Sequence, residues 1–251
     1  MSTARRKFGY GIWALGFGYF VFYTPYSGLT KALSKGLLRG MTAPVSGFEI
    51  LPVSAAATVV GMLGFITAMR WWKYATRRSL FGLNIPVPRV PTFLSGIYMA
   101  VIIGTTTLAF SFSGASIVFV LILLRGGVLI IGPVIDISLR RQVRWFSWGA
   151  LLVSLLSLMV ALSDVSNYLL SGLAVIDVTA YLAAYFFRFR LMTTLVKSDD
   201  QHATLRYFVE EQLVATPALF VGLALLAMVG RGEILTQLRL GFTALPSTAA
   251  V

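Results

Sequence analysis

Arg125 has the clearest chemical potential of any residue in this sequence. It lies in the stretch LILLRGG (residues 121–127), with apolar residues on both sides. Burying arginine in hydrocarbon costs about 2.5 kcal/mol or more, so such a residue usually faces the interior of a protein. Its planar guanidinium suits a carboxylate or a phosphate. We expect Arg125 to bind a solute or, alternatively, to form an intramembrane ion pair with Asp177 or Glu49.

Four further residues complete the predicted substrate-binding set of Arg125, Asp177, Tyr181, Thr106 and Glu49. Asp177 lies one helical turn before Tyr181, and its carboxylate can bind a cation, relay a proton or pair with Arg125. Thr106 belongs to a run of three threonines that can line a cavity, although hydroxyl residues also hold helices together. Glu49 lies near the start of an apolar stretch.

Other polar residues favour structural roles. Glu210 and Glu211 are predicted near a helix start, where they can pair with Arg188 or Arg190. His202, the only histidine, is predicted to be a solvated loop residue. Three prolines within the apolar stretches, at positions 25, 133 and 217, favour helix kinks over binding sites.

Several kinds of chemistry have no signature in this sequence. The absence of cysteine excludes disulfides, thiolate metal sites and cysteine nucleophiles. We find no metal-ligand cluster, phosphate-binding glycine loop or acyl-transfer triad. We therefore expect neither a cofactor nor an enzymatic activity.

The composition indicates a membrane protein. Apolar residues make up 57% and charged residues 12% of the 251 residues, whereas about 25% of a soluble protein is charged. The net charge of +12 would suggest nucleic acid in a soluble protein, but here the basic residues form short clusters between apolar runs. Such clusters contact anionic lipid headgroups, so we expect membrane lipids and no nucleic acid as partners.

Seven stretches are long and apolar enough to cross a bilayer, which takes about 20 residues. They lie near residues 8–28, 50–69, 92–112, 114–135, 145–163, 171–190 and 210–230. Ser111, Ser113 and Gly114 interrupt the longest apolar region, which favours two antiparallel helices there. Residues 234–251 form a half-span or an interfacial segment. The predicted fold is an all-α polytopic membrane bundle of seven or eight transmembrane helices.

The basic residues predict the orientation of these helices. With a cytoplasmic N-terminus, fifteen Lys and Arg residues fall on the cytoplasmic side and four on the other, namely Lys31, Lys35, Arg39 and Arg231. This asymmetry favours a cytoplasmic N-terminus and a bacterial inner membrane. Residues 30–47, an exception to it, have the spacing of a short amphipathic helix on the outer surface. Residues 5–7 lead into a first span that is retained and not cleaved.

A weak internal symmetry relates the first and sixth apolar stretches. An offset of 162 positions aligns Tyr19 with Tyr181 and Tyr23 with Tyr185, together with two leucines and a lysine. Five helices separate the two copies, so the second would enter the membrane from the opposite side. The pattern suggests an inverted repeat of five helices, the arrangement of many transporters.

Residues 108–163 carry a family resemblance. Three segments resemble the third to sixth helices of EamA-type members of the drug/metabolite transporter superfamily. They are LAFSFSGAS (residues 108–116), the basic ISLRRQVRWFSWG (residues 137–149) and residues 172–197, which are aromatic in the middle and basic at the end. The resemblance covers roughly residues 8–230. It implies ten helices in two inverted repeats around a solute cavity, with residues 1–165 as the first repeat and 166–251 as a partial second one. Three further helices would be expected after residue 230, so either this chain is part of a longer one or it is a shortened relative.

Three functions follow as hypotheses. The first is a secondary transporter that moves a small organic solute, an anion among the alternatives, by alternating access. The second is a structural subunit of a larger membrane assembly, with partner subunits or a homodimer. The third is a flippase for a lipid or a lipid-linked sugar. The resemblance and the charged residues within the spans favour the transporter.

Overall fold

The computed structural model describes residues 12–39, 41, 43–80, 83–111, 117–139, 145–163, 172–196, 200 and 202–243. Within them the chain forms eight α-helices, one short 3-10 helix and one β-hairpin. The elements are α1 (Ile12–Ser34), α2 (Gly47–Ala68), η1 (Trp71–Tyr74), β1 (Arg77–Leu80), β2 (Leu83–Pro86), α3 (Val90–Ser111), α4 (Ile117–Ser138), α5 (Trp145–Ser163), α6 (Gly172–Val196), α7 (Ala203–Val229) and α8 (Glu233–Thr243).

Five of these helices are long and apolar enough to cross a membrane, namely α2, α3, α4, α6 and α7. At a rise of about 1.5 Å per residue they reach roughly 33–40 Å, against a hydrocarbon core of about 30 Å. Large apolar side chains also cover the outside of the molecule, and Phe22, Trp145 and Val229 are each more than 80% exposed. Such a surface is suited to lipid, and the chain has the architecture of an integral membrane protein.

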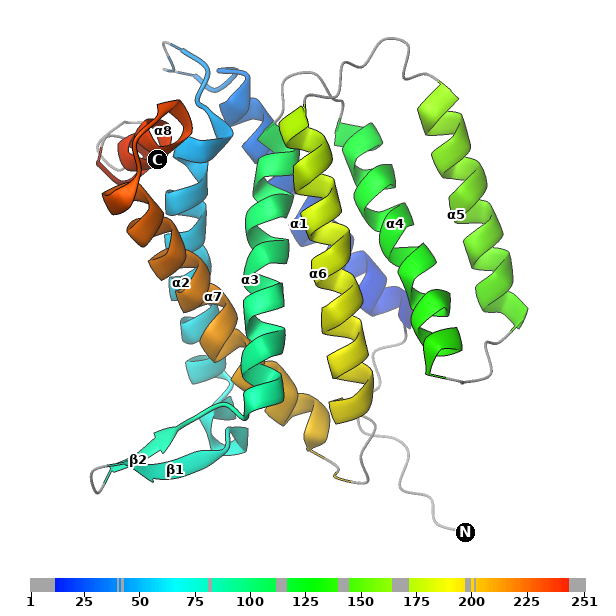
Figure 1. The fold of residues 1–251 in the computed structure, drawn as a ribbon, viewed down its shortest axis with the longest axis vertical. Coiled ribbons are helices and arrows are strands. Elements are labelled where there is room, and N and C mark those ends of the chain that lie inside the picture. The colour runs from blue at the N-terminus through cyan, green and yellow to red at the C-terminus, as the bar shows by residue number, and fades with distance from the viewer. Residues whose placement is uncertain are drawn as a thin grey trace.

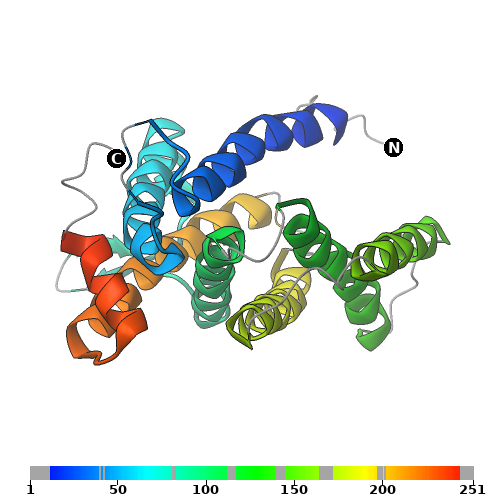
Figure 2. The ribbon, with the colours of Figure 1, turned by 90° about the horizontal axis from the view of Figure 1, so that it is seen from above.

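Helix α3 lies at the centre of the bundle, as Figures 1 and 2 show. It packs most extensively against α6 and α7, while α4 packs against α6, and α5 against α4 at the edge. Gly96 permits the close contact with α7, because a Cβ atom at this position would lie 2.5 Å from the Cβ of Val214. Such small residues let helix backbones approach each other in membranes.

Most of the predicted spans correspond to helices, with shifted ends. The longest apolar region is divided as expected, since α3 ends at Ser111 and α4 begins at Ile117. Helix α7 begins at Ala203, seven residues before the predicted start. The predicted eighth segment contains α8, whose Gly241 packs closely on the backbone of Glu49 in α2. The predictions for residues 1–11, 112–116, 140–144, 164–171, 197–199 and 244–251 lie outside the described residues.

The amphipathic helix predicted over residues 30–47 is wrong. Helix α1 continues to Ser34, its last residue, and Gly36 two positions later has a left-handed φ of 67°. The Gly36 N–H donates to Leu33 O, and the Leu37 N–H donates to Ala32 O over 2.9 Å. This Schellman motif caps the helix end, and the described residues between Gly36 and α2, namely 37–39, 41 and 43–46, are not helical.

The β-hairpin between α2 and α3 was not predicted. Strands β1 and β2 pair antiparallel, with Arg77 opposite Pro86 and Leu80 opposite Leu83. The hairpin projects sideways at the end of the bundle where α2 ends and α3 begins (Figure 1). At its base, Thr76 N–H and Oγ1–H donate to the buried carboxylate of Glu210 in α7, which therefore holds the hairpin against the bundle.

Candidate functional site

A cavity of about 750 Å³ borders Arg125 and is lined by residues of α1, α2, α3, α4 and α6. Its size falls within the range of roughly 300–1,000 Å³ that is usual for small-molecule sites. The lining is mostly aromatic and aliphatic. Among the described lining residues, Arg125 carries the one charged side chain. These residues are Gly18, Tyr19, Phe22, Tyr23, Tyr26, Thr58, Met62, Met99, Ile102, Ile103, Thr106, Arg125 and Tyr185.

Aromatic rings surround the guanidinium of Arg125. Its Cζ lies 4.8 Å from the ring centre of Tyr23 and 5.5 Å from that of Tyr19. Both distances are within the roughly 6 Å at which a cation interacts with the face of a ring. Nη1 also donates a long hydrogen bond of 3.4 Å to the hydroxyl of Tyr185. These contacts stabilise the cation, but they leave its positive charge without a counter-charge.

The alternative of an ion pair between Arg125 and Asp177 or Glu49 is not supported. Among the described residues, the ion pairs are Arg89–Glu210, Arg188–Glu211 and Arg206–Asp200. Arg125 therefore differs from Arg188, which is also within a long apolar helix but is neutralised by a carboxylate at 2.8 Å.

A second cavity, of about 380 Å³, also borders Arg125. It is lined by Tyr19, Phe20, Tyr23, Thr24, Ser27, Gly28, Leu121 and Arg125. Three side chains, Tyr19, Tyr23 and Arg125, thus line both cavities. The guanidinium and its two aromatic neighbours lie where the two spaces meet.

Two tyrosine hydroxyls at this site have no hydrogen-bond partner of ordinary geometry. They belong to Tyr23 and to Tyr181, whose side chain is fully buried. Tyr181 packs on Tyr185 with a ring separation of 4.7 Å and lies within electrostatic reach of Arg125. A buried hydroxyl normally has a partner, and the hydroxyl of Tyr23, which lines both cavities, can bind a water molecule or a ligand.

The structure brings together three of the five predicted site residues. Arg125 and Thr106 line the larger cavity, and Tyr181, which lines neither cavity, packs on Tyr185, which lines the larger one. The Thr106 hydroxyl already donates to Ile102 O over 2.6 Å, so it presents an acceptor to the cavity.

The other two predicted residues lie apart from the cavity lining. Asp177 is buried one turn before Tyr181 on α6, and its Oδ2 has no hydrogen-bond partner. Glu49 is in the first turn of α2, against α8.

A buried polar layer lies at the hairpin end of the bundle. The expected pairing of Glu211 with Arg188 is confirmed, with Nε–Oε1 and Nη2–Oε2 distances of 2.8 Å. Glu211 also accepts from Ser95 and Tyr207. Glu210 accepts from the backbone and side chain of Arg89 and from Thr92. Both carboxylates are fully satisfied, which makes this layer a structural element.

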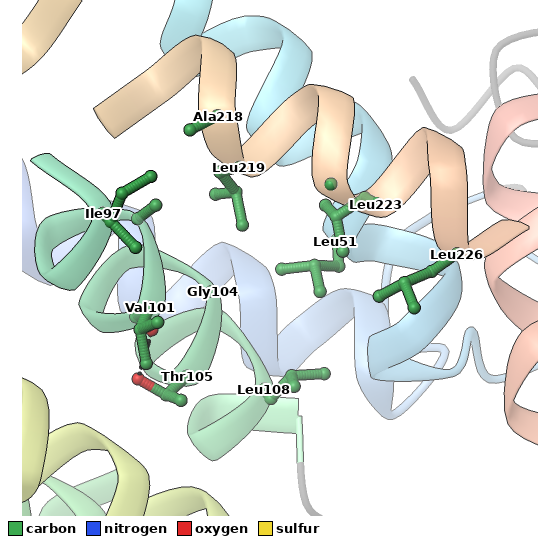
Figure 3. A pocket seen from close by; sticks show the side chains of 12 residues that line it. Leu51, Ile97, Val101, Gly104, Thr105, Leu108, Ala218, Leu219, Leu223 and Leu226 are labelled. Carbon is green, nitrogen blue, oxygen red and sulfur yellow. Dashed lines mark hydrogen bonds between the residues drawn. The ribbon is translucent and has the colours of Figure 1, made fainter. Parts of the chain in front are cut away.

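A third cavity, of about 350 Å³, lies between α3 and α7 and is lined almost entirely by hydrocarbon. Figure 3 shows Ile97, Val101 and Leu108 on one side and Leu219, Leu223 and Leu226 on the other. The Thr105 hydroxyl bonds to its own helix. Without a free polar group, this pocket can hold an apolar side chain or an acyl chain but cannot orient a polar solute.

The loop before α7 carries a carboxylate outside the long apolar helices. The His202 backbone N–H donates to Asp200 over 2.9 Å, and Arg206 pairs with Asp200 at 2.8 Å. Both contacts favour the charged form and lower the pKa of Asp200 below its ordinary value. His202 is exposed as predicted, and its ring lies 5.0 Å from that of Tyr74.

Sequence reasoning missed the tyrosines around Arg125. The sequence analysis did not place Tyr19 and Tyr23 beside Arg125, whereas both pack on its guanidinium in the structure. The 162-residue offset was the available signal, because it pairs Tyr19 with Tyr181 and Tyr23 with Tyr185. Three of these four tyrosines, Tyr19, Tyr23 and Tyr185, contact Arg125 in the structure.

No group of three or more His, Cys, Asp and Glu side chains that could hold a metal ion occurs within the described residues. No protein-family model, curated protein or solved structure matches this chain.

Proposed function

We propose that the protein is a secondary transporter that carries a small organic solute through the cavity at Arg125 by alternating access. The observation that carries the proposal is the partly buried guanidinium of Arg125, which has no described carboxylate partner and borders two cavities. Its burial in a membrane costs about 2.5–3.5 kcal/mol. Contacts with two rings that are not fully buried offset part of this cost, at roughly 0.5–1 kcal/mol each. A passing solute supplies the remaining compensation.

The proposed membrane arrangement adds α1 and α5 to the five helices that are long and apolar enough to span. These two have 23 and 19 residues, and the rows of exposed apolar side chains on both suit lipid. Seven spans and the distribution of basic residues support a cytoplasmic N-terminus in a bacterial inner membrane. The EamA-like segments and the four tyrosines related by the 162-residue offset support an inverted repeat.

Transport can be tested without knowing the solute. The purified chain is reconstituted into liposomes, which are incubated with a filtered cell extract of small molecules, and mass spectrometry identifies what accumulates relative to empty liposomes. We expect at least one solute to accumulate with the wild-type protein and not with Arg125→Ala. The matched control is Arg239→Ala, an exposed arginine in α8, which should transport normally. Equal accumulation in liposomes with and without protein would refute transport, and normal transport by Arg125→Ala would remove the role of the cavity.

One observation favours the alternative of a subunit in a larger assembly. The hydrocarbon-lined pocket between α3 and α7 has partly exposed walls, with Leu226 55% exposed (Figure 3). An apolar helix of another protein would cover it. Purification in a mild detergent should then yield a stoichiometric partner, whereas a chain that remains active in transport by itself would exclude the need for one.

A further inference from the structure

The charge of the site restricts what the cavity can bind. Arg125 is the one charged residue among the described residues that line the two adjoining cavities. An organic cation would be repelled by it. A dianion would bring a second negative charge for which these linings provide no cation, and an unpaired buried charge is strongly unfavourable. A single negative charge is the best match.

The donors around Arg125 suit a carboxylate. The guanidinium has five N–H donors, and the described hydrogen bond uses one of them, over a long 3.4 Å. The unpartnered hydroxyl of Tyr23, which lines both cavities, is a further potential donor. A carboxylate offers two oxygens that can accept a bidentate arginine and additional hydroxyl bonds.

The rest of the lining suits an apolar body. Phe22, Met62, Met99 and Ile103 offer only carbon and thioether surfaces. The Tyr26 hydroxyl is hydrogen-bonded to Thr107 at 2.7 Å, so it contributes mainly its ring. Rings of this kind favour stacked or edge contacts with another ring.

We infer that the substrate is a monocarboxylate with a compact apolar body, whose carboxylate binds Arg125 and Tyr23. This inference rests on the proposed transport function and adds the chemical class of the solute. Such a ligand can arrive from water, as an aromatic acid, or from the bilayer, as a fatty acid. Both share the carboxylate, and the experiment below separates them.

Calorimetric titration of the full chain in lipid nanodiscs tests the inference. The probes are benzoate and indole-3-acetate as soluble acids, laurate as a fatty acid, and benzylamine, benzyl alcohol and phenyl phosphate as matched compounds of other charge. We expect at least one of the three acids to bind at least about tenfold more tightly than each of the matched compounds, the difference that one charged hydrogen bond provides. Tighter binding of laurate than of benzoate and indole-3-acetate would assign the bilayer as the source, and the reverse would assign water.

Conservative variants assign the binding groups. Arg125→Gln should weaken the best acid at least about tenfold, and Tyr23→Phe, which keeps the ring, should weaken it roughly threefold to tenfold. Tyr98→Phe is the matched control, since Tyr98 stacks on Phe187 and does not line either cavity that borders Arg125. Its affinity should equal that of the wild type. Circular dichroism and size-exclusion profiles show whether each variant is folded.

Three results would overturn the inference, namely no binding of any of the three acids, equal or tighter binding of a matched compound, or unchanged affinity in a folded Arg125→Gln variant. These differ from a failure of the transport proposal. Binding of an acid without its accumulation in liposomes refutes transport but leaves the recognition intact. Accumulation of neutral or cationic solutes alone supports transport and refutes the chemical class.

Discussion

Removing the charge of Glu211 should destabilise the protein more than any change at an exposed ion pair. Glu211 is fully buried, whereas 15% of the Arg188 side chain is accessible. Glu211→Gln keeps the size of the side chain but leaves the guanidinium of Arg188 without its counter-charge. Breaking a buried pair in this way costs about 3–5 kcal/mol. Ser95 and Tyr207 also lose a charged acceptor, which places the expected loss in the upper part of that range.

The Arg206–Asp200 pair provides the matched control. Its N–O distance is also 2.8 Å, but its side chains are 34% and 36% exposed. Pairs of this kind contribute about 0–1 kcal/mol because water competes for both partners. Arg206→Met should therefore have little effect on stability. The two pairs have the same closest distance of 2.8 Å, so distance does not account for a difference between them.

Reversible unfolding in mixed micelles with increasing dodecyl sulfate measures both variants, with the loss of helical circular dichroism as the signal. A double variant, Arg188→Met/Glu211→Leu, should recover most of the stability, because it removes both buried charges together. A loss below about 1 kcal/mol for Glu211→Gln, or a loss equal to that of Arg206→Met, would refute the reasoning. It would mean that water reaches the Arg188 guanidinium and replaces the carboxylate.

Three further predictions test other parts of the structure. Gly96→Ala should cost about 1–3 kcal/mol by overpacking, since its Cβ would meet Val214 in α7, whereas Gly222→Ala, with nothing within 4 Å, should be tolerated in the same unfolding assay. Glu210→Gln should weaken the contact between the hairpin and α7 and accelerate tryptic cleavage within the hairpin on the order of tenfold. This factor corresponds to about 1.4 kcal/mol lost at the hairpin base. An unchanged cleavage rate would contradict the anchoring role of Glu210. The lowered pKa of Asp200 means that the charged carboxylate stabilises the fold at neutral pH and that this contribution is lost as the pH falls through that pKa. The stability difference between wild type and Asp200→Asn should therefore narrow on acidification. A difference that stays constant with pH would contradict this prediction.

The sequence by itself determined the class of the protein and the approximate positions of its helices. Apolar runs of about 20 residues cannot be accommodated in water, and their lengths match a bilayer whatever their neighbours are. The sequence also identified Arg125 as a charged residue within an apolar helix, because the apolar residues on both sides of it are visible in the local sequence. The pairing of Glu211 with Arg188 was predicted only as one of several combinations, and the structure selected it by placing α6 beside α7.

Tertiary structure decided where partners come from distant parts of the chain. The partners of Arg125 come from α1 and α6, and Asp177, one of the two carboxylates considered as an alternative partner, is not paired with it. Glu210 holds a hairpin that precedes it by more than a hundred residues. At Gly36, a local backbone cap ended the helix where side-chain periodicity predicted another. Periodicity and composition indicate whether a segment lies in lipid or in water. Which residues contact each other depends on how the helices pack, and that is a property of the whole fold.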